Sequence, residues 1–269
     1  MRVGFIGLGG QGAPMARRIV EAGFTTTLWA RRPAGLEPFA GTAARTAGSP
    51  AELAAHSDLV CLCVVADADV EQVASGVLEE LRPGGVIPVH STVHPDTCRR
   101  LAERAAARGV SVLDAPVSGG GRAAEQGTLL VMAGGDPEVF AFCRPVFATY
   151  GDPVVHLGPV GSGQVAKLLN NTLFTAQLGL AAETLALGGA LGLDPAALGR
   201  ILPRGSAASF ALERVAETGG TLDRVGAHVG GLLAKDVRLL GEVADAAGQA
   251  AGRGPVRDAA RAALDAMGW

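Results

Sequence analysis

The sequence predicts an α/β protein in which a doubly wound parallel sheet precedes a long helix and an all-helical region. Short apolar runs alternate with helical segments up to residue 157, a pattern typical of a parallel sheet covered on both faces. From residue 163 onward no strand is indicated, and residues 165–191 are apolar enough for one buried helix. A length of 269 residues favours two domains. We expect them at residues 1–160 and 161–269.

Each expected element follows from local pattern. β-branched and apolar runs predict strands, and Gly23 stands where a helix C-cap is expected. The expected strands are residues 3–6, 25–29, 59–65, 86–90, 110–113, 129–133 and 154–157. The expected helices are residues 13–22, 50–55, 70–81, 95–107, 137–147, 165–191, 195–202, 232–247 and 256–266.

Composition excludes several classes of protein. The hydrophobic fraction of 48% is too high for a disordered chain. The net charge is −3 with scattered basic residues, which argues against nucleic acid as a partner. The longest uncharged run, residues 168–182, is shorter than the roughly 18 apolar residues of a membrane helix. The four cysteines show no metal-ligand or disulfide spacing, and no signal peptide is evident, so we expect a cytoplasmic protein without a metal.

A glycine-rich motif follows the first expected strand and opens the first expected helix. In this context it predicts a dinucleotide site, in which helix N–H groups face the phosphates. Gly7 permits the tight turn, Gly9 lets a pyrophosphate approach the backbone, and Gly12 allows close helix packing. The motif consists of Gly7, Leu8, Gly9, Gly10, Gln11 and Gly12.

The second strand indicates which dinucleotide binds. An NAD site usually has an acidic residue about 20 positions on, but none lies between Glu21 and Glu37. Arg31 and Arg32 follow the strand instead. Two guanidinium groups suit a 2′-phosphate, so we expect NADP(H), with NAD as the alternative. The same pair is also compatible with an ordinary exposed surface.

Lysine is almost absent from this chain. Of 23 basic residues only Lys167 and Lys235 are lysines, and the only asparagines are Asn170 and Asn171. Arginine replaces lysine on a surface, but it cannot give up a proton near neutral pH. Lys167 is therefore a candidate acid/base. It precedes Asn171 by one helical turn, near the expected start of the long helix, where the dipole and a dry site lower an amine pKa.

A second glycine-rich segment, residues 114–121, follows the strand at 110–113. Successive glycine N–H groups beside the hydroxyl of Ser118 form a donor site for an anion such as a carboxylate. Gly119 and Gly120 supply these N–H groups. The alternative is a plain turn.

Four blocks in order resemble the β-hydroxyacid dehydrogenases, a family that includes 3-hydroxyisobutyrate dehydrogenase and tartronate semialdehyde reductase. They are GLGGQG at 7–12, DAPVSGG at 114–120, GSGQVAKLLNN at 161–171 and AKD at 234–236. The resemblance covers nearly the whole chain. It implies a Rossmann domain, a long interdomain helix and an all-α second domain that supports a homodimer or homotetramer.

The resemblance also implies residue roles. Lys167 would be the catalytic acid/base in the interconversion of a small 3-hydroxy acid and its semialdehyde. Ser118, Gly119 and Gly120 would bind the substrate carboxylate, and Asn171 would hydrogen-bond the substrate. Lys235 and Asp236 would reach cofactor and substrate. The remaining cofactor positions implied are Val64, Val65, Ser91 and Thr92.

Two positions depart from the family pattern. His90 stands where an aspartate is common, and His228 stands where an aromatic residue is expected. Two other functions remain open. An imine reductase shares the nucleotide motifs but usually lacks the lysine, and a sensor or scaffold would keep the fold without turnover.

Overall fold

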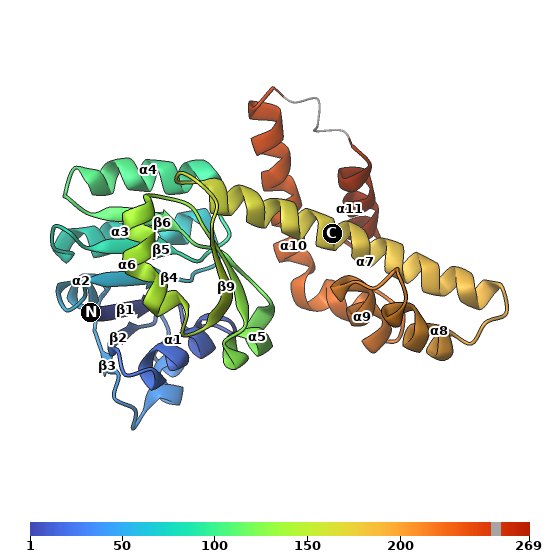
Figure 1. Cartoon of the computed structure of the whole chain (residues 1–269), viewed down its shortest axis with the longest axis horizontal. Helices are drawn as coiled ribbons and strands as arrows, with labels where there is room; N and C mark the ends of the chain where they lie inside the picture. The colour runs from blue at the N-terminus through green and yellow to red at the C-terminus, as the bar shows by residue number, and fades with distance from the viewer. Residues whose placement is uncertain (249–253) are drawn as a thin grey trace. The chain divides into compact units, whose positions relative to one another are not determined.

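A computed structural model describes residues 1–248 and 254–269. The chain forms two compact units, Met1–Lys167 and Leu168–Trp269, which are described separately below (Figure 1).

The first unit is built on a six-stranded parallel sheet with the order β3-β2-β1-β4-β5-β6. The order reverses between β1 and β4, which is the topological switch point at which ligands bind in such sheets. The strands are β1 (Arg2–Ile6), β2 (Thr25–Trp29), β3 (Arg45–Thr46), β4 (Leu59–Leu62), β5 (Val86–Val89) and β6 (Ser111–Asp114).

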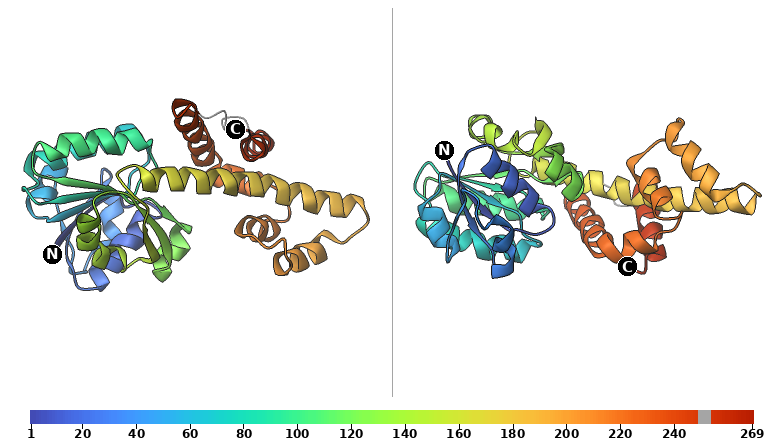
Figure 2. Two further views of the ribbon diagram at one scale, coloured as in Figure 1. Left: turned by 45° about the horizontal axis from the view of Figure 1, so that its top comes forward. Right: turned by 90° about the horizontal axis from the view of Figure 1, so that it is seen from below.

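Both faces of the inner strands β1, β4 and β5 are buried, which explains why these strands are largely apolar rather than alternating. Val3 and Phe5 of β1 face one core with α1, α6 and the smaller sheet, whereas Ile6 faces a second core with α2, α3 and α4. Figure 2 shows helices on both faces of the sheet. The predicted Rossmann architecture is confirmed. The helices are α1 (Gly12–Glu21), α2 (Pro50–Ala55), α3 (Asp67–Glu80), α4 (Pro95–Ala106) and α6 (Pro137–Phe147).

A three-stranded sheet, β7-β8-β9, completes this unit. β7 (Val117–Ser118) is antiparallel to β8 (Leu129–Ala133), which is parallel to β9 (Gly151–His156). A single bridge between Asp114 and Gly134 joins the end of β6 to the residue after β8.

The second unit is helical within the described residues. α7 (Ser162–Ala190) is one uninterrupted helix that begins in the first unit (Figure 1). Its residues Leu178 and Leu185 pack with the other helices around one apolar cluster. Those helices are α8 (Pro195–Ile201), η2 (Leu202–Arg204), α9 (Phe210–Glu217), α10 (Asp223–Ala246) and α11 (Pro255–Ala266). No helix among the described residues is long and apolar enough to cross a bilayer.

Several short elements and one long extension were not expected from the sequence. α10 begins nine residues before the expected position, and the segment after Ser118 forms a short helix rather than an open glycine loop. The other unexpected elements are η1 (Pro33–Phe39), β3, β7, α9 and η2.

Candidate functional site

The glycine-rich loop between β1 and α1 has the shape that a dinucleotide requires. Gly7 has φ +103°, and a Cβ at this position would overlap the carbonyl oxygen of Cys63. A Cβ on Gly12 would overlap the carbonyl oxygen of Gly7, so α1 can pack closely only with glycine there. At Gly9 and Gly10, by contrast, an added Cβ would meet no atom within 4 Å. Two glycines are thus required by the fold, and the other two have open space beside their backbone.

The second glycine motif lies against this loop. Ser118 ends β7, Gly119 has φ +129° and caps α5 (Gly120–Gln126). A Cβ on Gly121 would lie 2.8 Å from the carbonyl oxygen of Gly10. Gly119 and Gly120 are exposed and Ser118 is half-buried. The expected anion-binding residues therefore lie next to the nucleotide loop.

Arg31 and Arg32 follow β2 immediately, and both are exposed. One guanidinium nitrogen of Arg31 donates to Oδ1 of Asp69 on α3 at 3.2 Å. This pair is exposed to solvent and contributes little to stability. The planar guanidinium has five N–H donors, so further donors of Arg31 are available to a phosphate.

A hydrogen bond to a side chain links the segments that follow β4 and β5. The backbone N–H of Val64 donates to Oγ of Ser91 at 2.8 Å. Ser91 is buried, Thr92 and Val64 are half-buried, and Val65 is exposed. The carboxyl ends of these central strands lie beside the Gly7 turn, since a Cβ on Gly7 would also approach the Val64 nitrogen at 3.2 Å. The four residues implied for cofactor contact thus occupy neighbouring positions at the carboxyl-terminal ends of β4 and β5.

Lys167 is the sixth residue of α7 and is buried, with 8% of its surface exposed. A buried lysine is uncommon, because burial disfavours its charge. Asn171 follows four residues later in the same helix, a spacing that places two side chains on one side of a helix.

In the second unit, the structure brings together three of the residues expected to reach the substrate. Nδ2 of Asn171 donates to Oδ2 of Asp236 at 2.6 Å, and Nζ of Lys235 lies 3.0 Å from Oδ1 of Asp236. Asn170 donates from its Nδ2 to Oδ1 of Asn171 at 3.0 Å. Asp236 is buried and is held between an amide and an ammonium group. His228, on the other hand, is exposed on α10.

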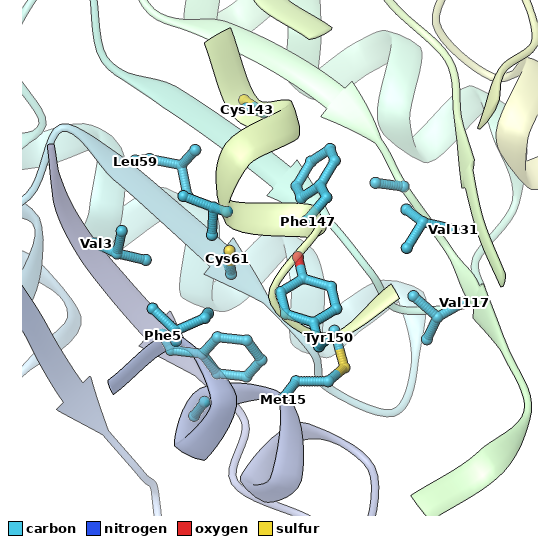
Figure 3. Close-up of a cluster of buried hydrophobic side chains, with 14 of the residues drawn as sticks. Val3, Phe5, Met15, Leu59, Cys61, Val117, Val131, Cys143, Phe147 and Tyr150 are labelled. Carbon is cyan, nitrogen blue, oxygen red and sulfur yellow. The ribbon is translucent and has the colours of Figure 1, made fainter. Parts of the chain in front are cut away.

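Sequence reasoning missed a buried pair, His90 and Tyr150. Tyr150 is fully buried among Phe5, Cys61 and Phe147 (Figure 3). Its hydroxyl lies 3.1 Å from Nε2 of His90, while Nδ1 of His90 lies 2.7 Å from the carbonyl oxygen of Ala115. Since a carbonyl only accepts, Nδ1 carries the proton and Nε2 accepts from Tyr150. Burial lowers the pKa of His90 to about 4.

Sequence reasoning also assigned no role to the side chains of Asp114 and Gln164, both of which are buried at the start of α7. Asp114 accepts backbone N–H groups from this helix start, and Gln164 bonds the segment after β5. The signal available in the sequence was their position inside two of the motif blocks.

No candidate metal centre occurs among residues 1–248 and 254–269, where His, Cys, Asp and Glu side chains form no group of three. All four cysteines are free, and Cys61, Cys98 and Cys143 are buried.

Comparison with known protein families matches both parts of the chain. Residues 2–158 match the NAD binding domain of 6-phosphogluconate dehydrogenase. Residues 161–267 match the family described as NAD-binding of NADP-dependent 3-hydroxyisobutyrate dehydrogenase.

Curated relatives cover most of the chain. An NAD-dependent L-serine dehydrogenase from Pseudomonas aeruginosa is 35% identical over 91% of this chain and 86% of its own length. A 3-hydroxyisobutyrate dehydrogenase from the same organism is 35% identical over 88% of this chain and 81% of its own length. The human mitochondrial 3-hydroxyisobutyrate dehydrogenase is 33% identical over 88% of this chain and 74% of its own length.

A solved structure agrees with these matches. Mycobacterium tuberculosis 3-hydroxyisobutyrate dehydrogenase with L-serine has a TM-score of 0.83 and 27% identity, and the alignment covers 96% of this chain and 90% of that one. Together with the family matches, this shows that the chain belongs to the β-hydroxyacid dehydrogenase family of NAD(P)-binding oxidoreductases, which includes 3-hydroxyisobutyrate dehydrogenase.

Proposed function

We propose that this protein is an NADP(H)-dependent reductase that interconverts a small semialdehyde bearing a carboxylate and the corresponding 3-hydroxy acid. The observation that carries the proposal is the burial of Lys167 on α7, in a chain that has only one other lysine. A surface lysine would have been replaceable by arginine, whereas an acid/base must release its proton.

The nucleotide loop supports NADP(H) through two groups of residues. Gly9 and Gly10 leave open backbone for the pyrophosphate at the N-terminus of α1. Arg31 and Arg32 are exposed where the second strand ends, and their guanidinium groups suit the 2′-phosphate. When it is bound, the nicotinamide supplies hydride chemistry at its C4 atom.

Lys167 supports the proton half of the reaction. In the direction of reduction, its Nζ donates a proton to the aldehyde oxygen as the carbonyl becomes an alcohol. In the direction of oxidation, the same nitrogen accepts that proton. The backbone N–H groups of Gly119 and Gly120 and the hydroxyl of Ser118 hold the substrate carboxylate. Asn171, Lys235 and Asp236 provide further polar contacts to the substrate, and Lys235 also reaches the cofactor.

The experiment is turnover of NADPH with a panel of small semialdehydes, with cyclic imines as the alternative substrate class. Reduction of at least one carboxylate-bearing semialdehyde, with little turnover of imines, is the expected result. Turnover of imines alone would replace this function with imine reduction. Tight binding of NADPH without turnover of any member would favour a sensor.

We also propose that the protein forms a homodimer or homotetramer through α7. Four leucines on this helix are exposed by about half or more of their surface, and successive members are separated by four, seven and seven residues. At about 100° per residue this spacing aligns them on one stripe. An apolar stripe of this length marks an interaction surface. The residues are Leu169, Leu173, Leu180 and Leu187.

A cytoplasmic location is part of the same proposal. It is supported by the four unpaired cysteines, since reduced thiols are the rule in the cytosol.

A further inference from the structure

Asp114 ends β6 and binds the start of α7. Its side chain is fully buried, and its two oxygens have different partners. Oδ1 accepts the backbone N–H of Gly161 at 2.7 Å, and Oδ2 accepts that of Gln164 at 2.8 Å. Burial raises the pKa of Asp114, and these backbone donors oppose the rise. A carboxylate at this place satisfies N–H groups that the helix cannot satisfy itself.

Two glycines fix Asp114 against the helix start. A Cβ on Gly134 would lie 2.6 Å from Oδ1 of Asp114 and 2.7 Å from the carbonyl oxygen of Pro159. A Cβ on Gly163 would overlap the carbonyl oxygen of Met132 and lie 2.9 Å from Oδ2 of Asp114. The backbones of β8 and α7 are therefore in direct contact around this carboxylate, which leaves it little room to shift.

Gln164 binds the first turn of α7 to the segment after β5. Its side chain is fully buried. Oε1 accepts the backbone N–H of Val93 at 3.1 Å, and Nε2 donates to the carbonyl oxygen of Ser91 at 2.8 Å. Ser91 in turn accepts from the N–H of Val64 through its hydroxyl at 2.8 Å. Hydrogen bonds thus connect two of the proposed cofactor residues to the helix that carries Lys167.

We propose that Asp114 and Gln164 are positioning residues that hold Lys167 in register with the cofactor segment. Lys167 lies three residues after Gln164, so any shift or rotation of the first turn moves its amine as well. A misplacement of about 1 Å can cost a reaction about a hundredfold in rate. This inference rests on the proposed role of Lys167 as the acid/base.

The first test is Asp114→Asn, with Asp136→Asn as the matched control. Asparagine offers one acceptor oxygen, so at position 114 one of the two N–H groups loses its partner. Asp136 caps α6 through Oδ1 alone, at 2.8 Å to the N–H of Glu138 and 3.1 Å to that of Val139, so asparagine keeps both bonds there. We expect kcat to fall about tenfold or more in Asp114→Asn, with NADPH affinity within about twofold, and to stay unchanged in Asp136→Asn.

The second test is Gln164→Met, which keeps the length of the side chain but removes its hydrogen bonds to Val93, Ser91 and Cys98. Gln177→Met, the same change further along α7, is its control. Gln164→Glu should retain the bond from Val93 and lose those that Nε2 donates to Ser91 and Cys98, and we expect it to recover part of the lost kcat. Gln164→Met and Gln164→Glu also test the inference if Asp114→Asn does not fold.

The deciding measurement combines each change with Lys167→Ala. Because the two residues act through Lys167, Asp114→Asn and Gln164→Met should lower kcat in the natural chain but leave the residual rate of the Lys167→Ala protein unchanged within about twofold. Equal fold losses in both backgrounds would indicate a merely structural role and overturn the inference. A natural kcat in both single variants would also overturn the inference. If Lys167→Ala alone keeps natural turnover, the proposed function itself fails, which is a different outcome.

Discussion

The hydroxyl of Tyr150 donates to Nε2 of His90 at 3.1 Å, across 60 residues of sequence, in the core beneath the central sheet. The Nδ1–H of His90 donates to Ala115, so a neutral imidazole satisfies both neighbours. A proton on Nε2 would face the tyrosine hydroxyl and would have to be buried with its charge. The folded protein therefore requires the neutral form of His90.

This requirement predicts acid sensitivity. The pKa of His90 is lowered from 6.5 to about 4, chiefly by burial. Below about pH 6.5 the unfolded chain binds a proton that the folded chain does not, so the stabilisation present above that pH is lost as pH falls toward about 4. Between about pH 7 and pH 5 the free energy of unfolding should fall by about 2 kcal/mol from this group.

Urea unfolding of the natural chain and His90→Asn at both pH values measures that effect. The loss on acidification should be smaller in the variant by about the same amount. Tyr150→Phe is the control, because it removes the hydroxyl while leaving His90 buried, and it should retain most of the pH dependence. An equal loss in all three proteins would contradict the role of His90.

The nucleotide loop allows a matched pair of glycine substitutions. Gly9→Ala adds a methyl group into open space, so the melting temperature should stay unchanged while NADPH binding weakens at least about tenfold, because the methyl occupies the pyrophosphate path. Gly12→Ala should instead lower the melting temperature, since its methyl overlaps the Gly7 carbonyl. Titration calorimetry and thermal unfolding separate the two effects. Unaltered NADPH affinity in Gly9→Ala would place the cofactor elsewhere.

Arg31 and Arg32 should set the preference for NADP(H). Each charge-assisted hydrogen bond to the 2′-phosphate is worth about 1.5–3 kcal/mol, so the double change to alanine should lower kcat/KM with NADPH at least about tenfold and leave that with NADH nearly constant. Arg104→Ala, which alters an exposed arginine of α4, is the control. Equal losses with both cofactors would show that the arginines do not discriminate between them.

The leucine stripe on α7 should hold subunits together. Leu180→Glu with Leu187→Glu places two charges on its centre, and these should convert an oligomer to a monomer at micromolar concentration while the helical circular dichroism is kept. Sedimentation velocity measures the change. Sedimentation of the natural chain as a monomer would contradict the proposed assembly.

Local pattern predicted the longer strands well, but not β3 and β7, which have only two residues each. Residues 25–29 and 129–133 were predicted with the bounds that β2 and β8 have in the structure. Local pattern did not predict the first part of α10, where glycines allow close packing. α10 begins at Asp223 and includes Gly226 and Gly230, which lower helix propensity. A Cβ on Gly226 would lie 2.9 Å from Cβ of Met267, and one on Gly230 would overlap the Trp269 indole.

The candidate site divides in a similar way. Gly9 and Ser118 could be proposed from their local glycine-rich motifs, and Lys167 from the rarity of lysine, and their roles stay predictions. The contacts of Asp114 and Gln164 could not, because their partners lie 47 to 73 residues away. Long-range hydrogen bonds leave no periodic signal in one sequence.

The most direct test of the central claim compares kcat and NADPH affinity of the natural chain with those of Lys167→Ala and Lys167→Arg, using a semialdehyde that the natural protein reduces. Both variants should lose at least about a hundredfold in kcat with NADPH affinity nearly unchanged, because arginine keeps the charge but cannot exchange the proton. Near-natural kcat in Lys167→Arg would contradict the assignment of Lys167 as the acid/base.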